Sequence, residues 1–215
     1  MLMQSFGFSI YCLVFGSGWL LWWASEYLIH RFVGHGQWIR LPFALHHRKH
    51  HALGNYFAPL IDKVKISVIV GASIFLLVAL LCPWKIAAVF TSGFILSYLG
   101  YEWLHRRAHT HPPRSWYGRW ARRHHFHHHF MDPSSNHGVT TSWGDLLFAT
   151  KRVPAKIRVP EKLKMPWLTD PKTGEVWSEF SDDYEIIALK KRVDRRVKNT
   201  PSPAKTNQEI SVPCV

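Results

Sequence analysis

The chain has 215 residues, of which 47% are hydrophobic and 19% charged, and its formal net charge is +13. This composition excludes a disordered chain, because such chains have few aromatic residues and a high charge density. The three cysteines, Cys12, Cys82 and Cys214, lie too far apart for a disulfide framework or a paired-cysteine zinc module. Histidine is unusually frequent, with fifteen residues.

Three stretches of the chain carry almost no charge. They run from Met1 to Ser25, from Ile66 to Cys82, and from Ile86 to Tyr101, and the third can extend to Leu104. A membrane-spanning helix needs about 20 mostly apolar residues, and these stretches lack the polar stripe of a helix in a soluble bundle. The sequence therefore predicts an all-α integral membrane protein with about three transmembrane spans and a cytosolic, histidine-rich helical cap.

The distribution of Lys and Arg predicts the orientation of these spans. The stretch before the first span has no charge, whereas the segment from His30 to Lys65 and the whole chain after Leu104 are strongly basic. By the positive-inside rule the N-terminus lies outside, and the histidines and the C-terminus are cytoplasmic. We expect a multi-pass protein of the bacterial inner membrane or of the eukaryotic endoplasmic reticulum. The basic face can contact anionic lipid, and no nucleic-acid partner is expected.

Ten histidines lie at spacings that suit metal binding, and all follow the predicted spans. Residues three and four apart share one face of a helix, so each set can direct its imidazoles to one point. The candidate metal ligands are His30, His35, His47, His50, His51, His105, His109, His125, His128 and His129.

One pair, His30 and His35, does not fit a regular α-helix, because residues five apart lie about 140° apart around the helix axis. This pair requires the helix to loosen, and Gly34 and Gly36 lie where that could happen. Ten imidazoles are enough for two metal ions with room for oxygen or a substrate. Imidazole suits iron, zinc, copper and nickel, so spacing alone does not select the metal.

Other histidines and two carboxylates have weaker patterns. A histidine at the end of a helix can simply be a solvated cation, and this applies to His46, His111, His124, His127 and His137. Because His111 and His137 lie on no helical triplet, we expect them to matter less for metal retention. A carboxylate-bridged di-iron bundle would need more glutamates than Glu26 and Glu102. The candidates to orient the ligand imidazoles are Glu26, Glu102, His124 and Asp145.

The spaced histidines and their neighbours resemble the fatty acid hydroxylase/sterol desaturase superfamily over about residues 20 to 150. The matching motifs are His30-x4-His35, His47-x2-His50-His51, His105-x3-His109 and His125-x2-His128-His129, with the flanks Tyr101-Glu102-Trp103, Arg122-Arg123, Asp132-Pro133 and Gly138-Val139-Thr140-Thr141. The chain departs from the family pattern at His137, where an aromatic residue is common, and in its three rather than four predicted spans.

The resemblance implies an oxygen-dependent lipid hydroxylase or desaturase with a dinuclear centre, for which iron is expected and zinc is possible. The substrate would be a fatty acyl chain, a sphingolipid, a sterol or a carotenoid. No fused cytochrome b5 domain is visible, so a separate cytochrome b5- or ferredoxin-type electron donor is expected. The alternative is a membrane metal-binding or metal-transport protein without redox catalysis, although its ligands would then be expected within the spans.

The sequence predicts three regions. Residues 1–150 form the membrane-embedded oxidase domain with its four histidine motifs. Residues 151–198 form a cytosolic extension, extended over the surface from Ala155 to Pro171 and ending in a short amphipathic helix from Ser181 to Lys198. Residues 199–215 are expected to be a disordered tail.

Overall fold

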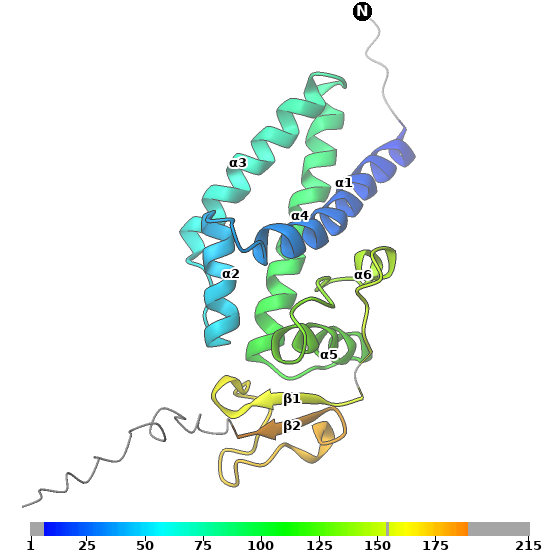
Figure 1. Cartoon of the computed structure of the whole chain (residues 1–215). Coiled ribbons are helices and arrows are strands. Elements are labelled where there is room, and N and C mark those ends of the chain that lie inside the picture. Colours follow the sequence, from blue (N-terminus) through cyan, green and yellow to red (C-terminus); the bar gives the residue numbers. More distant parts are fainter. Residues whose placement is uncertain (1–6, 154, 189–215) are drawn as a thin grey trace, which may run out of the picture.

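A computed structural model describes residues 7–153 and 155–188, and these residues are mostly helical (Figure 1). The long helices extend away from one end of the molecule, where the shorter helices and a small sheet gather. The helices are α1 (Phe8–Leu28), which continues into the π-helix η1 (Ile29–Gly34), α2 (Pro42–Leu53), α3 (Leu60–Ala79), α4 (Trp84–Thr110), α5 (Trp116–Phe130) and α6 (Trp143–Leu147).

Two glycines allow α1 and α4 to pack with their backbones in close contact. A Cβ atom at Gly18 would lie 2.0 Å from the carbonyl oxygen of Phe90, and one at Gly93 would lie 2.1 Å from that of Phe15. Next to this contact, the ring of Trp22 packs edge-on against Phe94. Small residues at helix contacts are typical of membrane proteins, because close packing replaces the hydrophobic effect as the source of stability.

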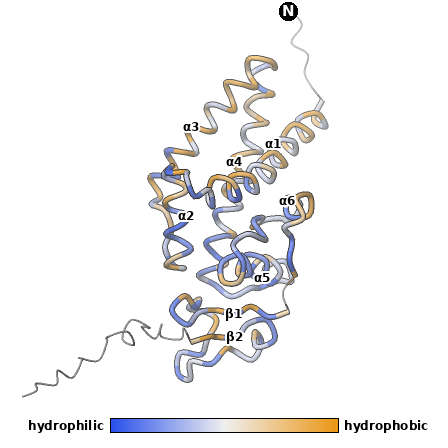
Figure 2. Tube along the Cα trace, in the orientation of Figure 1, coloured by the Kyte–Doolittle hydropathy of each residue, from blue (hydrophilic) through white to orange (hydrophobic). Residues whose placement is uncertain are grey.

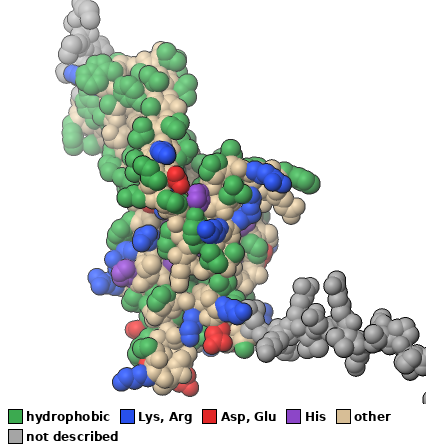
Figure 3. All heavy atoms as spheres, turned by 90° about the vertical axis from the view of Figure 1, so that its left-hand side faces the viewer, with side chains coloured by type: hydrophobic (Ala, Val, Ile, Leu, Met, Phe, Trp, Pro, Cys, Tyr) green, Lys and Arg blue, Asp and Glu red, His purple; other side chains and the backbone are tan. Residues whose placement is uncertain are grey.

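Apolar side chains remain exposed on the outer ends of these helices. Leu80 and Leu81, at the turn between α3 and α4, are 80% and 88% exposed. Figure 2 shows the apolar residues concentrated along α1, α3 and the outer part of α4, and Figure 3 shows charged side chains gathered towards the opposite end. The molecule is therefore divided into an apolar zone and a polar zone.

Among the described residues, one helix, Phe8–Gly34, is long and apolar enough to cross a membrane, judged by length and composition. The helix α3 carries Asp62, Lys63 and Lys65 in its first two turns, and every stretch of 18 residues within it includes all three. The other two predicted spans therefore stay a prediction.

The chain after residue 150 forms a second core. The strands β1 (Ile157–Pro160) and β2 (Tyr184–Ile187) pair in parallel, with Ile157 opposite Tyr184, and the single-turn 3-10 helices η2 (Glu161–Leu163) and η3 (Ser178–Phe180) lie between them. Apolar side chains of this region pack against α4 and α5. The core residues are Ala108, Phe126, Ile157, Val159, Met165, Trp167, Leu168, Phe180 and Tyr184.

Three predictions for this region need correction. The fold is mostly rather than entirely helical, because β1 and β2 form a sheet. The segment from Ala155 to Pro171 is not confined to the surface, since its spaced apolar residues enter the core. The predicted helix from Ser181 to Lys198 is wrong in its described part, where apolar and β-branched residues pair as β2. Its remainder and the predicted tail of residues 199–215 lie outside the described residues.

The close contact of α1 and α4 predicts that Gly93→Ala destabilises the protein, whereas Gly100→Ala does not. A methyl group at residue 93 would meet the backbone of α1, but nothing lies within 4 Å of the position of a Cβ at Gly100. Overpacking of this kind costs about 1–3 kcal/mol. The measurement is the melting temperature of the purified variants in detergent. Equal melting temperatures for both variants would show that this backbone contact is absent.

Candidate dinuclear metal centre

The ten predicted ligand histidines lie in two groups of five. Within each group, one ring nitrogen of every histidine lies within 4.8 Å of those of the other four. The first group is His30, His35, His47, His51 and His128, and the second group is His50, His105, His109, His125 and His129. Both α2 and α5 contribute to each group, so the two groups are adjacent and share these helices.

The π-helix η1 brings His30 and His35 together. A π-helix makes i→i+5 hydrogen bonds, so residues five apart lie near each other on one face. The two ring centroids are 5.3 Å apart. Gly34 is required here, because a Cβ would lie 2.9 Å from Cδ2 of His47. The prediction that the helix loosens at this pair is confirmed.

The nitrogen separations in the first group match those of ligands around one ion. Nε2 of His35 lies 2.9 Å from Nε2 of His128 and 3.0 Å from Nε2 of His47, and Nε2 of His128 lies 3.2 Å from Nε2 of His51. Two imidazole nitrogens bound at about 2.1 Å, at a right angle, would be about 3.0 Å apart. The imidazoles of the first group therefore fit a transition-metal ion.

The second group shows the same spacing and several unpartnered nitrogens. Nε2 of His109 and Nε2 of His125 lie 3.0 Å apart. Nε2 of His50, Nε2 of His105 and both ring nitrogens of His129 are buried without a hydrogen-bond partner. Because buried polar atoms are almost always satisfied, nitrogens left unpaired and turned towards one another fit a second cation.

Backbone carbonyl groups orient at least one ligand in three of the four histidine motifs. In each case the ring Nδ1 donates to a carbonyl oxygen, which fixes the tautomer and leaves Nε2 as the ligand atom. The pairs are His30 with the carbonyl of His137, His50 with that of Tyr56 at 2.7 Å, and His128 with that of Ser135 at 2.8 Å.

The two glutamates proposed for this orienting role have other partners. Glu26 accepts hydrogen bonds from the backbone amides of Val139 and Thr140 and from the Thr140 hydroxyl. Glu102 pairs with Lys63 and accepts from the Tyr98 hydroxyl. Within the described part of the chain, neither carboxylate bonds to an imidazole. Glu26 instead ties α1 to the loop that supplies the carbonyl for His30.

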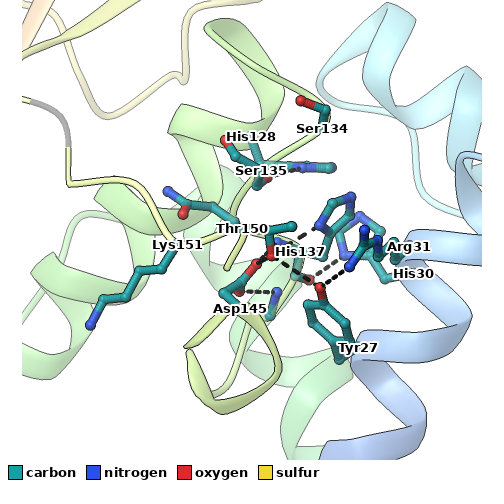
Figure 4. A network of polar contacts seen from close by, with 12 residues as sticks. Tyr27, His30, Arg31, His128, Ser134, Ser135, His137, Asp145, Thr150 and Lys151 are labelled. Atoms are coloured by element: carbon teal, nitrogen blue, oxygen red, sulfur yellow. Dashed lines mark hydrogen bonds and ion pairs between the residues drawn. The ribbon is translucent and has the colours of Figure 1, made fainter. Parts of the chain in front are cut away.

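Asp145 holds the same loop from its other side (Figure 4). Its carboxylate accepts from the backbone amides of His137 and Gly138, both at 2.9 Å, and from the Thr150 hydroxyl at 2.7 Å. Burial raises the pKa of Asp145, but these hydrogen bonds and that from His124 outweigh it and hold the pKa well below its usual range. Asp145 therefore bonds to the loop and to His124 rather than to a predicted ligand ring, and its orienting role stays a prediction.

The histidines left as possible solvated cations differ in their surroundings. His111 is exposed, and His46 is half-buried beside Asp62, whereas His124 is buried and bonds to Asp145 at 3.0 Å. His127 is also buried.

His137 lies next to the first group, a contact that sequence spacing did not reveal. Its ring is buried and its centroid lies 5.2 Å from that of His128 and 5.6 Å from that of His30. It packs against the first group, although it is not one of the five. Spacing could not reveal this, because His137 lies in a loop. The adjoining Asn136, with a positive φ of 54°, and Gly138 mark a sharp loop turn.

Burial keeps the ligand imidazoles neutral. It lowers the pKa of His35 to about 4, that of His50 to about 4 and that of His51 to about 3, from an ordinary value of 6.5. Metal binding requires the neutral ring, so the groups are prepared for an ion at neutral pH.

The known proteins that this chain resembles are fatty acid hydroxylases. The family model described as fatty acid hydroxylase matches residues 15–150. The chain is 31% identical over 150 residues to the fatty acid 2-hydroxylase of Rattus norvegicus, which covers 66% of this chain and 40% of the relative. It is 27% identical to the dihydroceramide fatty acyl 2-hydroxylase FAH2 of Arabidopsis thaliana, over 64% of this chain and 60% of that protein. The chain thus spans about two fifths of the rat relative's length.

A solved structure shows the same fold. The hydroxylase domain seen in the structure of full-length scs7p matches with a TM-score of 0.57 and 28% sequence identity. The match covers 71% of this chain and 60% of that one.

The two groups of imidazoles predict that His50→Ala and His128→Ala each lose about one of two bound metal ions, because each removes a nitrogen from a different group. The exposed His111 provides the matched control, and His111→Ala should retain both ions. Elemental analysis of the purified proteins measures this. Full metal content in both ligand variants would refute the assignment.

The lowered pKa values predict that the metal-free protein loses stability as the pH falls. Between about pH 6.5 and about pH 4, the unfolded chain binds more protons than the folded one, because His35 and His50 titrate near 4 when folded. The melting temperature of metal-depleted protein should therefore be lower at pH 5 than at pH 7.5. A melting temperature that is constant or rises towards pH 5 would contradict this.

Proposed function

We propose a function from one premise: the chain belongs to the fatty acid hydroxylase family. The proposed activity is the oxygen-dependent hydroxylation of a fatty acyl chain, free or in a sphingolipid, at carbon 2. The names of the relatives, which are fatty acid and fatty acyl 2-hydroxylases, support both carbon 2 as the site of hydroxylation and the acyl chain as the substrate class. The observation that carries the proposal is the pair of adjacent five-imidazole groups.

Iron is the proposed metal, and zinc is the alternative. The ten imidazoles fit two transition-metal ions by number, spacing and neutrality. When bound, a pair of iron ions supplies oxygen-dependent oxidation of an unactivated C–H bond. The protein's own contribution is to hold the ions with imidazole Nε2 atoms, to fix the rings by backbone carbonyl groups, and to exclude water by burial.

The apolar zone supports a membrane location for this reaction. We propose that α3 and α4 cross the bilayer together with α1, because their outer ends expose leucines such as Leu76, Leu80 and Leu81. The metal groups lie at the polar end of α1 and α4, so an acyl chain in the bilayer can reach them from between the helices. The basic residues at this end support a cytoplasmic location for it, where a cytochrome b5- or ferredoxin-type protein would supply electrons.

Expression in cells that lack fatty acid 2-hydroxylase activity tests this proposal. Cells fed with an acid deuterated at carbon 2 should form a lipid that has gained one oxygen atom and lost one deuterium from that carbon. His105→Ala should abolish the product, because it removes a buried ring from the second group, and the control His111→Ala should retain it.

Other products would select other functions. A lipid that lacks two hydrogen atoms and gains no oxygen would indicate a desaturase. Bound metal without any lipid product, despite oxygen and an electron donor, would favour a metal-binding or metal-transport protein and refute the hydroxylase proposal.

A further inference from the structure

A basic pocket outside the two histidine groups lies along α5. Its volume is about 400 Å³, within the range of small-molecule sites. Five lining residues come from α5 at the spacing of one helix face, and three come from the segment after α6. The lining residues are Trp116, Arg119, Trp120, Arg123 and His124, with Lys151, Arg152 and Val153.

The cations of this pocket are only partly neutralised. Asp183 pairs with both Arg119 and Arg123. The Arg152 guanidinium donates to backbone carbonyls alone, and the Lys151 ammonium has no hydrogen-bond or ion-pair partner among the described residues. Figure 4 shows the Lys151 side chain directed away from the polar network around Asp145. The pocket therefore carries excess positive charge, which favours an anion.

Exposed apolar side chains border the same pocket. Trp116 and Val153 line it and are 81% and 83% exposed, and Leu147, at the end of α6, is 80% exposed. Trp is the residue type most characteristic of a membrane interface. A basic pocket between exposed apolar groups has the chemistry of a site for a lipid with an anionic headgroup.

The short helix α6 and the residue after it pack against α1, the candidate membrane helix. Phe148 stacks on Tyr27 near the end of α1, with ring centroids 5.1 Å apart. Gly144 of α6 lies so close to Tyr27 that a Cβ would be 2.2 Å from its ring. Because α1 is the helix suited by length and composition to span a membrane, α6 lies beside the inner end of that candidate span, and the chain runs from there into the pocket lining at Lys151.

We propose that this pocket binds the phosphate group of an anionic phospholipid from the leaflet next to the metal centre. Arg119, Arg123, Lys151 and Arg152 would surround the phosphate, and Trp116 and Val153 would contact the acyl region. Arginine guanidinium groups and a lysine ammonium are the usual phosphate partners in proteins. Such binding would fix α5, which carries ligands of both histidine groups, against the bilayer surface. The site does not depend on the reaction proposed above.

Native mass spectrometry of the full chain in detergent tests the site, with phosphatidic acid as the probe and phosphatidylcholine of the same chain length for comparison. The pocket variant is Lys151→Ala with Arg152→Ala. The matched control is Lys162→Ala with Lys172→Ala, which removes the same charge from exposed positions outside the pocket. The wild type should prefer phosphatidic acid. The pocket variant should bind it about tenfold more weakly or worse, and the control should stay close to wild type. If the double variant does not fold, Lys151→Ala alone replaces it, because its ammonium has no partner to lose.

Three outcomes would overturn the proposal. Equal weakening in the pocket variant and the control would mean that binding follows overall charge. Inorganic phosphate that competes as strongly as phosphatidic acid would identify a site for free phosphate rather than lipid. Loss of affinity for an acidic protein such as cytochrome b5, with unchanged lipid binding, would identify a protein-docking site.

Discussion

The structure depends on gathering ten neutral, mostly buried imidazoles with their nitrogens turned towards one another. Such nitrogens lose their hydrogen bonds to water on folding, and several, such as Nε2 of His30, His50 and His105, find no protein partner in return. This arrangement is unfavourable unless cations occupy the two groups, so metal binding and folding are coupled. Burial also disfavours the charged form of each ring, and it therefore lowers the pKa values of His35, His50 and His51.

The surrounding structure holds these rings through the backbone more than through carboxylates. The loop at residues 137–140 supplies the carbonyl that bonds to His30. Two carboxylates hold this loop by accepting from its backbone amides, that of Glu26 in α1 and that of Asp145 in α6. Arg122 joins the end of α4 to α5 by donating to the carbonyls of Arg107 and His111, at 2.9 and 2.8 Å. Helices that carry ligands are thereby joined by contacts that do not involve an ion.

Helical spacing was sufficient to single out eight of the ten clustered histidines, because residues three or four apart share a face, and His30 and His35 were added although they lie five apart. The spacing also predicted a loosened helix at His30 and His35, because two residues five positions apart do not lie on one face of a regular α-helix. Spacing could not divide the ten into two groups. His50 and His51 are neighbours in the sequence but belong to different groups, and only the packing of α2 between the other helices separates them.

Features that depend on contacts distant in the sequence were missed. The contacts of His137 with the first group arise from a loop folded against α1, and no periodic pattern marks them. Asp145 was an expected orienting residue, but its hydrogen bonds to this loop were not foreseen. The strands β1 and β2 were missed because each has only four residues. The first lies in a segment rich in Pro and Lys, and the second lies in a charged segment whose pattern predicted a helix. Their pairing across a long connection is a tertiary effect. The predicted spans rest on charge-free stretches, and among the described residues one helix, Phe8–Gly34, is long and apolar enough to cross a membrane.

X-ray absorption spectroscopy at the metal edge of the purified protein tests the central claim most directly, because it reports the atoms bound to the ions. We expect a nitrogen-dominated shell at about 2.1 Å, with the outer scattering of several imidazole rings and no sulfur. A shell dominated by carboxylate oxygens, or one with too few imidazoles to use both histidine groups, would contradict it.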